Sequence, residues 1–173
     1  MENIWLFWTS EVDSGVLEYL QEHLAEAFSR SVKRGSVFEL LPEEFHTHRG
    51  QYYSTSILGR LRQMKPERDL LLAITEADLF AAGLNFVFGE ADVYGRCAII
   101  SLARLRLACV GQPLTRELFL RRALTEAVHE IGHLLRLGHC PNPTCVMHFS
   151  NTLYDTDYKT SQFCSRCQKY LLG

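Results

Sequence analysis

The sequence has no long apolar run, no strong charge of either sign, no internal repeat and no low-complexity segment. A membrane-spanning helix needs about 20 consecutive apolar residues, and no stretch here approaches that length. The apolar run at 4–8 is too short for a secretory signal and lies between Glu2 and Glu11, so no signal peptide is expected. The 18 Lys and Arg residues nearly balance the 20 Asp and Glu residues, and the net charge of −2 gives no reason to expect a nucleic-acid partner.

The length of 173 residues predicts a single domain, since compact domains run to roughly 100–200 residues. Apolar residues make up 47% and charged residues 22%, which is ordinary for a globular protein with a substantial core. We therefore expect neither disorder nor a membrane protein, and we expect a monomer.

Hydrophobic periodicity predicts an alternation of strands and helices over the first two thirds of the chain. Strands are expected at 4–8, 36–41, 70–75, 85–89 and 96–105, and helices at 14–30, 54–64 and about 116–137. This order favours an α/β fold with a largely parallel sheet. After residue 137 the chain becomes polar and irregular, so we divide the domain into an upper part, 1–137, and a lower C-terminal subdomain, 138–173.

Six cysteines are present, and four of them form two closely spaced pairs in the C-terminal subdomain. Cys140 and Cys145 are spaced C-x4-C, and Cys164 and Cys167 are spaced C-x2-C. Such pairs are typical of a tetrahedral zinc site, and with no export signal they favour a reducing, cytoplasmic location over disulfides. The other two, at 97 and 109, lie in apolar stretches and are interpreted as small buried side chains.

The segment His129-Glu130-Ile131-Gly132-His133 carries the clearest chemical signal. On a helix, residues four apart lie about 40° apart on one face, so the two imidazoles can bind one zinc ion. Glu130 lies beside the ion without being needed as a ligand, a position that suits a general base acting on water.

A catalytic zinc site needs a third protein ligand and one open position, and His139 is the candidate. A straight helix would carry residue 139 about 9 Å beyond residue 133, so the helix must end and the chain must turn back. Gly138 is able to adopt the left-handed conformation that ends helices, and Pro141 prevents the helix from resuming.

The run HEIGHLLRLGHCPNPTCVM, followed by SQFCSRC, resembles the archaemetzincins, a family of metzincin-clan zinc metallopeptidases. Their pattern is H-E-x-x-H-x-x-G-x-x-H-C-x4-C-x-M with a C-x-x-C near the C-terminus. The segments TEADLF, NFVFGEA and ISLARL upstream also look like the family's strands. The resemblance covers most of the chain from about residue 70 onward.

The resemblance implies two Zn²⁺ ions, one catalytic and one structural. It implies that three histidines hold the catalytic zinc, that Glu130 is the general base, and that Met147 is the Met-turn residue beneath the metal. The implied ligand sets are His129, His133 and His139 for the catalytic ion, and Cys140, Cys145, Cys164 and Cys167 for the structural ion.

The resemblance also implies a metzincin-like α/β fold, with a twisted, mostly parallel sheet, an antiparallel edge strand and a long active-site helix. Below the helix lies an irregular C-terminal subdomain that a zinc ion holds together. By this resemblance we assign the substrate-binding edge strand to Asn85, Phe86, Val87, Phe88 and Gly89.

One departure from the family pattern concerns the turn after the helix. The family's turn glycine falls at position 136, where this chain has Arg136, and Gly138 follows two residues later. Either Arg136 takes a positive φ, or the helix runs on and Gly138 makes the turn.

The predicted reaction is hydrolysis of a peptide or protein substrate. A single-metal RNase with three histidines at the same spacing is an alternative, supported only by the basic run Arg104, Arg106, Arg116, Arg121 and Arg122. A catalytically silent, zinc-stabilised peptide-binding module is another. His148, Tyr154 and Tyr158 are candidates for a side chain that assists at the oxyanion.

Overall fold

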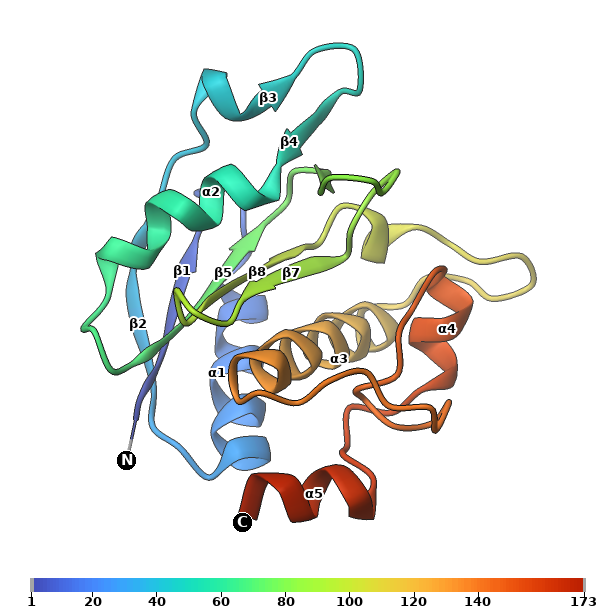
Figure 1. Cartoon of the computed structure of the whole chain (residues 1–173). Coiled ribbons are helices and arrows are strands. Elements are labelled where there is room, and N and C mark those ends of the chain that lie inside the picture. Colours follow the sequence, from blue (N-terminus) through green and yellow to red (C-terminus); the bar gives the residue numbers. More distant parts are fainter. Residues whose placement is uncertain (1, 173) are drawn as a thin grey trace.

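A computed structural model describes residues 2–172 and is built around a five-stranded sheet in the order β2-β1-β5-β8-β7 (Figure 1). The strands are β1 (Ile4–Trp8), β2 (Val32–Val37), β5 (Leu70–Thr75), β7 (Gly89–Asp92) and β8 (Cys97–Ser101). The first four strands in this order run parallel, and β7 lies at the edge, antiparallel to β8. The predicted α/β class, with a mostly parallel sheet and an antiparallel edge strand, is confirmed.

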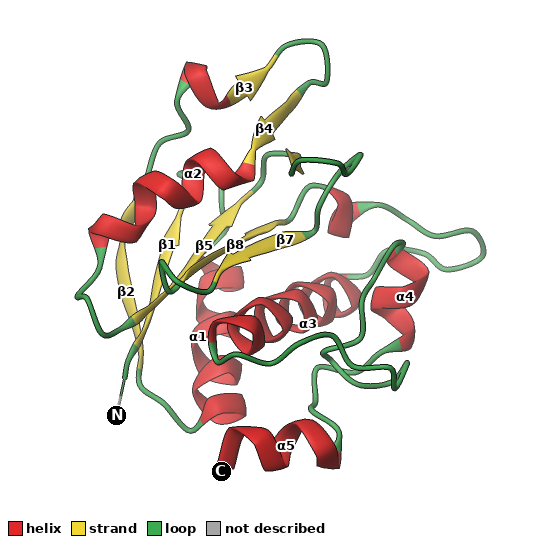
Figure 2. Cartoon of the chain, viewed as in Figure 1, coloured by secondary structure: helices red, strands yellow, loops and turns green. Residues whose placement is uncertain are grey.

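Helices cover both faces of this sheet. α1 (Ser14–Phe28) and α3 (Arg116–Leu134) pack against one face, and α2 (Ser54–Leu61) packs against the other (Figure 2). Each face has its own hydrophobic cluster. β5, with the sequence LLLAIT, is buried along its whole length because it contributes side chains to both clusters, as a continuous apolar run predicts.

Three strand predictions need correction, and the one at 85–89 is described with the site below. The second strand is β2, four residues earlier than the predicted 36–41, because β2 is an outer strand whose exposed side chains leave no apolar signal. Phe38 and Leu40, which suggested a strand there, instead pack into the cluster beneath α2. The predicted strand at 96–105 ends at Ser101 and is followed by a short 3-10 helix, η3 (Arg104–Arg106).

A second, small sheet is formed by strands that were not among those predicted from the sequence. It has the order β3-β4-β6 and follows the 3-10 helix η1 (Pro42–Glu44). Its strands are β3 (Phe45–His46), β4 (Gln51–Tyr53) and β6 (Leu79–Phe80). These strands are two or three residues long, too short for an alternating pattern to register. A further 3-10 helix, η2 (Arg62–Met64), extends α2 to the predicted end at residue 64.

The helix α3 is the element that carries the HExxH segment. Its first turn is capped by Thr115, whose hydroxyl accepts a hydrogen bond from the Leu118 amide at 3.1 Å. The helix is buried on nearly every side, because the sheet and α1 cover one flank and the C-terminal segment covers another (Figure 1). It ends at Leu134 and not at about residue 137 as predicted.

The C-terminal segment is more regular than the sequence predicted, since it contains α4 (Leu153–Tyr158) and α5 (Ser165–Leu172). α4 begins with a capping box, in which the side chains of Thr152 and Asp155 each accept a hydrogen bond from the other's amide. This T-x-x-D pattern was the available signal for the helix.

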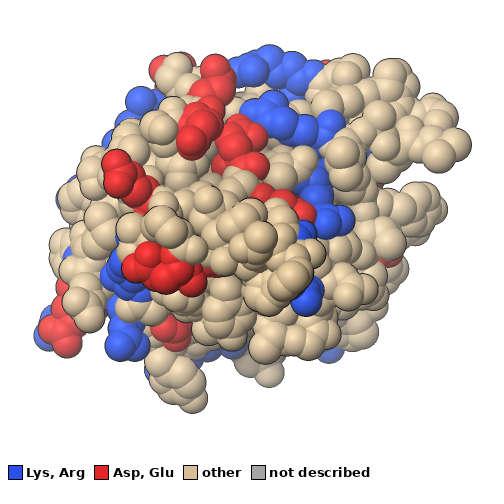
Figure 3. Space-filling view, turned by 90° about the horizontal axis from the view of Figure 1, so that it is seen from above, with Lys and Arg blue, Asp and Glu red and all other residues tan. Residues whose placement is uncertain are grey.

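Charged side chains of both signs are interspersed over the face shown in Figure 3, and neither sign forms a continuous field there. Within residues 2–172, none of the helices is long and apolar enough to cross a membrane.

Candidate metal centres and the adjoining cavity

Three imidazoles converge at the end of α3. His129 and His133 project from successive turns of the helix, and their Nε2 atoms lie 3.1 Å apart. His139 comes from the segment after the helix, and its ring centroid lies 5.4 Å from that of His129 and 4.9 Å from that of His133. One ligand nitrogen from each residue falls within 4.8 Å of the others. Three nitrogens this close, each able to turn a lone pair inward, fit a tetrahedral metal with one open position.

Backbone carbonyls orient two of these rings. The Nδ1 atom of His129 lies 2.7 Å from the Val146 carbonyl oxygen, and that of His133 lies 2.8 Å from the Leu137 carbonyl oxygen. A carbonyl only accepts, so Nδ1 carries the proton in both rings and the lone pair lies on Nε2. The sequence had predicted the pair of ligands but not the two carbonyls that set their tautomer.

The electrostatic setting keeps the three imidazoles neutral. Burial, with contributions from Lys159 and His133, lowers the pKa of His129 to about 2. Burial also lowers the pKa of His133 and of His139 below the ordinary value. Because a histidine binds metal only as the neutral imidazole, these nitrogens are ready for a metal ion at neutral pH.

The turn that returns His139 to the helix is made by Arg136, which has φ of 67°. Leu137 donates its amide hydrogen to the Gly132 carbonyl at 3.0 Å, and Arg136 donates to the His133 carbonyl at 2.8 Å. These two bonds define a Schellman motif with arginine at the left-handed position. Gly138 is not among the residues with positive φ, so the alternative in which it makes the turn is wrong.

Glu130 is buried and lines a cavity of about 550 Å³ together with the three histidines. Burial raises the pKa of Glu130 well above its ordinary value; the neighbouring Glu126 adds to the rise and Lys159 opposes it. A carboxylate whose pKa is raised takes a proton more readily than an ordinary carboxylate.

The opposite wall of the cavity is formed by the segment 83–91, which leads into β7. The strand predicted at 85–89 begins only at Gly89, whereas 85–88 are irregular and are tied to β6 by the Val87 amide, 2.9 Å from the Leu79 carbonyl oxygen. A Cβ atom at Gly89 would lie 2.6 Å from Glu130 Oε1, so glycine is what lets this wall approach the carboxyl group.

The four paired cysteines converge on a second point. The Sγ atoms of Cys140 and Cys164 lie 3.8 Å apart, as do those of Cys145 and Cys167, and all four fall within 4.8 Å of one another. All six cysteines of the chain are free thiols. Four converging sulfurs are the donor set of a closed structural zinc site.

The thiols differ in how readily they ionise. Burial raises the pKa of Cys145 and of Cys167. The Cys167 amide, which hydrogen-bonds the sulfur, is the main cause of the lowering of the Cys164 pKa to about 6. Cys164 is therefore the thiolate most available to a metal at neutral pH.

Met147 is fully buried and packs directly beneath α3. A Cβ atom at Gly132, between the two helix histidines, would overlap the Met147 sulfur. Its neighbour His148 turns Nδ1 to the Cys140 carbonyl oxygen at 2.8 Å. His148, Tyr154 and Tyr158, the predicted oxyanion candidates, are not among the described residues that line the cavity.

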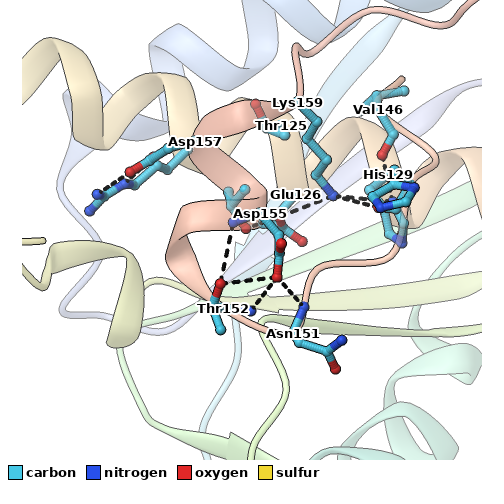
Figure 4. A network of polar contacts seen from close by, with 12 residues as sticks. Thr125, Glu126, His129, Val146, Asn151, Thr152, Asp155, Asp157 and Lys159 are labelled. Carbon is cyan, nitrogen blue, oxygen red and sulfur yellow. Dashed lines mark hydrogen bonds and ion pairs between the residues drawn. The ribbon is translucent and has the colours of Figure 1, made fainter. Parts of the chain in front are cut away.

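Lys159 and Glu126 are buried close to the histidines and were missed by the sequence analysis (Figure 4). The Lys159 ammonium lies 3.4 Å from Glu126 Oε1 and 3.5 Å from His129 Nδ1. Lys159 sits in a polar tail, where lysine normally faces water, so the sequence offered no signal for it.

The basic run that suggested an RNA-binding alternative is largely paired. Four of its five arginines form ion pairs: Arg104 with Asp78, Arg106 with Glu76, Arg116 with Asp13, and Arg122 with Asp157. Arg122 is fully buried, so it is a structural anchor for α4 and offers no charge to a phosphate.

Comparison with known proteins agrees with this geometry. The model of peptidase family M54 matches residues 36–172. The archaemetzincin of Methanocaldococcus jannaschii is 41% identical over 167 residues, covering 93% of this chain and 88% of that protein. The crystal structure of the Methanopyrus kandleri archaemetzincin superposes with a TM-score of 0.88 at 38% identity, covering 99% of this chain and 93% of that one. A zinc-dependent peptidase from Methanocorpusculum labreanum superposes with a TM-score of 0.85 at 31% identity, covering 98% and 100%.

Proposed function

The chain belongs to peptidase family M54 and is a zinc metallopeptidase, and from that premise we propose that His129, His133 and His139 hold the catalytic zinc while Glu130 is the general base. The observation that carries this proposal is the convergence of three neutral imidazoles on one point beside a buried carboxyl group in the same cavity.

When bound, zinc supplies a Lewis acid that polarises the scissile carbonyl and lowers the pKa of a coordinated water. Glu130 takes a proton from the attacking water and returns it to the amine nitrogen that leaves. The raised pKa of Glu130 suits the first of these steps, because a more basic carboxylate takes a proton more readily.

The substrate is a peptide or protein, and we place its backbone along the free edge of β7. β7 is the last strand of the sheet, and among residues 2–172 its strand partner is β8 alone, so its other side is a free sheet edge. An extended peptide that adds to this edge gains main-chain hydrogen bonds and passes the cavity that contains Glu130.

The second proposed ion is structural and is held by Cys140, Cys145, Cys164 and Cys167. Their sulfurs fill a tetrahedral shell and leave no position for substrate. The proposed content is therefore two zinc ions per chain, with chemistry at the histidine site alone.

The test compares Glu130→Gln with wild type on a mixed peptide library read by mass spectrometry. Glu117→Gln is the matched control, since Glu117 is an exposed residue in the first turn of the same helix. Loss of a positioned acid–base group costs about 10²–10⁴-fold in rate, so cleavage by Glu130→Gln is expected to fall by that factor with its zinc content intact.

The control variant is expected to cleave at the wild-type rate. Cleavage by Glu130→Gln at the wild-type rate would remove Glu130 from the mechanism. Peptides that bind to zinc-loaded wild type and remain uncut would overturn the proposed activity.

A further inference from the structure

A lysine side chain is buried beside the histidine site, where positive charge is least favourable. The side chain of Lys159 is 0% exposed, and that of Glu126, its ion-pair partner, is 3% exposed. Burial of an ammonium group costs several kcal/mol unless charge and hydrogen bonds compensate it. A metal cation at the histidine site would increase that cost. The burial of Lys159 therefore indicates that its ammonium group has a specific role there.

The Lys159 ammonium has three polar neighbours, two of them side chains of α3 (Figure 4). It donates to the His148 carbonyl oxygen at 3.1 Å and pairs with Glu126 Oε1 at 3.4 Å. The same oxygen accepts a hydrogen bond from the Thr156 hydroxyl at 3.0 Å. The third neighbour is His129 Nδ1 at 3.5 Å, which already directs its proton to Val146 and offers Lys159 no lone pair. The ammonium therefore lies between the carboxylate and the imidazole.

Glu126 and His129 are three residues apart on α3, a spacing that places two side chains on the same face of a helix. A carboxylate is a stronger acceptor than a backbone carbonyl, because hydrogen bonds to an ionised group are about twice as strong as neutral ones. Without the ammonium, the buried Glu126 carboxylate would keep the Thr156 hydroxyl as a donor and would compete with the Val146 carbonyl for the Nδ1–H group of His129.

We propose that Lys159 is a positioning residue that holds the Glu126 carboxylate away from His129, so that His129 keeps its hydrogen bond to the neutral Val146 carbonyl. A carboxylate on Nδ1 makes an imidazole a more basic ligand, and a more basic ligand makes the bound metal a weaker Lewis acid. Lys159 thus protects both the ring orientation and the electron-poor character of the site. This inference rests on the proposed function, in which His129 is a zinc ligand.

The test uses zinc-loaded protein with ¹⁵N-labelled histidine, in which NMR reads the imidazole Nδ1–H proton of each ligand. In Lys159→Met, the His129 proton is expected to move downfield, because its acceptor becomes a carboxylate. The His133 proton is an internal reference, since its acceptor, the Leu137 carbonyl, is unaffected. Lys169→Met, the same change at an exposed lysine on α5, is the matched control and leaves both protons in place.

The double variant Lys159→Met/Glu126→Gln separates this role from simple packing. It lacks the ammonium but also lacks the carboxylate, so the His129 proton is expected to return to its wild-type position. We expect Lys159→Met alone to lower kcat by about 10–100-fold with KM unchanged, as changes behind a metal ligand do, and we expect the double variant to recover most of this loss.

The following outcomes decide the inference. An unmoved His129 proton in Lys159→Met, or an equal displacement in the double variant, overturns it. If Lys159→Met alone fails to fold, a folded double variant with the wild-type His129 proton supports it, and a double variant that also fails to fold overturns it. If zinc changes no histidine proton even in wild type, the proposed function itself fails, a result distinct from the others.

Discussion

The histidine site and the cysteine site are neighbours in the chain, because His139 and Cys140 are consecutive, yet the fold holds them in different ways. The histidine site is anchored on α3, a helix of 19 residues buried between the sheet and the C-terminal segment. The cysteines come from the turns after that helix and from the start of α5, where few large apolar side chains are buried.

This difference indicates what a metal would contribute at each of the two sites. The histidine ligands are oriented by packing and by backbone carbonyls, so their site is largely formed before the metal arrives. The cysteine segment has too little apolar burial to offset the cost of ordering its backbone, about 1–2 kcal/mol per residue. We therefore expect the histidine metal to serve catalysis and the cysteine metal to serve folding.

The largest effect expected from this comparison follows removal of the cysteine metal. A structural zinc contributes on the order of 10 kcal/mol of binding free energy coupled to folding. Elemental analysis is expected to give two zinc ions per chain, and a strong chelator that removes both is expected to expose the C-terminal segment to protease. A content of one zinc or less, with the four paired thiols readily alkylated, would remove the structural site.

The two sites are also expected to differ in how their zinc affinity depends on pH. The pKa values of the three site histidines are lowered from the ordinary value of 6.5, so between pH 6.5 and 8 these rings release fewer protons on binding zinc than ordinary imidazoles would. The pKa values of Cys145 and Cys167 lie above 9, so both thiols are protonated in that range and must lose a proton.

Zinc affinity at the cysteine site is therefore expected to fall about tenfold per pH unit for each of these two thiols as pH decreases, while affinity at the histidine site stays nearly constant. Competition titrations with zinc chelators at pH 6.5, 7.2 and 8 measure both slopes. Equal slopes at the two sites would contradict the assignment of neutral imidazoles.

How far the sequence predicted the two sites follows from the range of the interactions involved. The pairing of His129 with His133 depends on helical spacing alone, and the family resemblance, now confirmed, reached the cysteines through their spacing along the chain. β5 and α1 were predicted for the same reason, because local periodicity carries them.

What the sequence did not predict depends on contacts between distant segments. The Val146 carbonyl behind His129, the ammonium of Lys159, and the place of β2 at one edge of the sheet are set by tertiary packing. Local pattern even pointed the wrong way at Gly138, because glycine is the usual residue in a left-handed turn and Arg136 takes that conformation here.

A mutation in the cysteine site tests whether the two sites are coupled. Cys145 directly precedes Val146, whose carbonyl orients His129, and the Cys140 amide donates to the Met147 carbonyl at 2.9 Å. We therefore expect Cys164→Ser to loosen the C-terminal segment and also to lower zinc affinity at the histidine site by about 10–100-fold, the usual cost of disturbing the groups behind a ligand.

Limited proteolysis and a metal titration of this variant measure the two effects. Cys97→Ser, the same chemical change at a residue of β8 that packs on the α2 side of the sheet, is the control and is expected to leave both quantities at the wild-type level. A protected C-terminal segment together with wild-type affinity at the histidine site would mean that the sites are independent.

The smallest expected effect concerns the turn between the two sites, where Arg136 has φ of 67°. A left-handed conformation costs a residue with a Cβ atom about 1–2 kcal/mol, and glycine avoids that cost while losing about 0.4–1 kcal/mol to its greater freedom in the unfolded chain. Arg136→Gly is therefore expected to raise the unfolding free energy by about 0.5–1 kcal/mol, which corresponds to a rise in Tm of roughly 1–4 °C for a domain of this size.

The matched control is Gly138→Ala, because Gly138 has no positive φ and an added Cβ there meets no atom within 4 Å. This control is expected to keep or slightly raise stability, and both variants are expected to keep wild-type zinc affinity, since the turn and His139 stay in place. Thermal unfolding that instead shows a loss of stability in Gly138→Ala and no gain in Arg136→Gly would place the left-handed residue at 138, and the helix would then run on past Leu134.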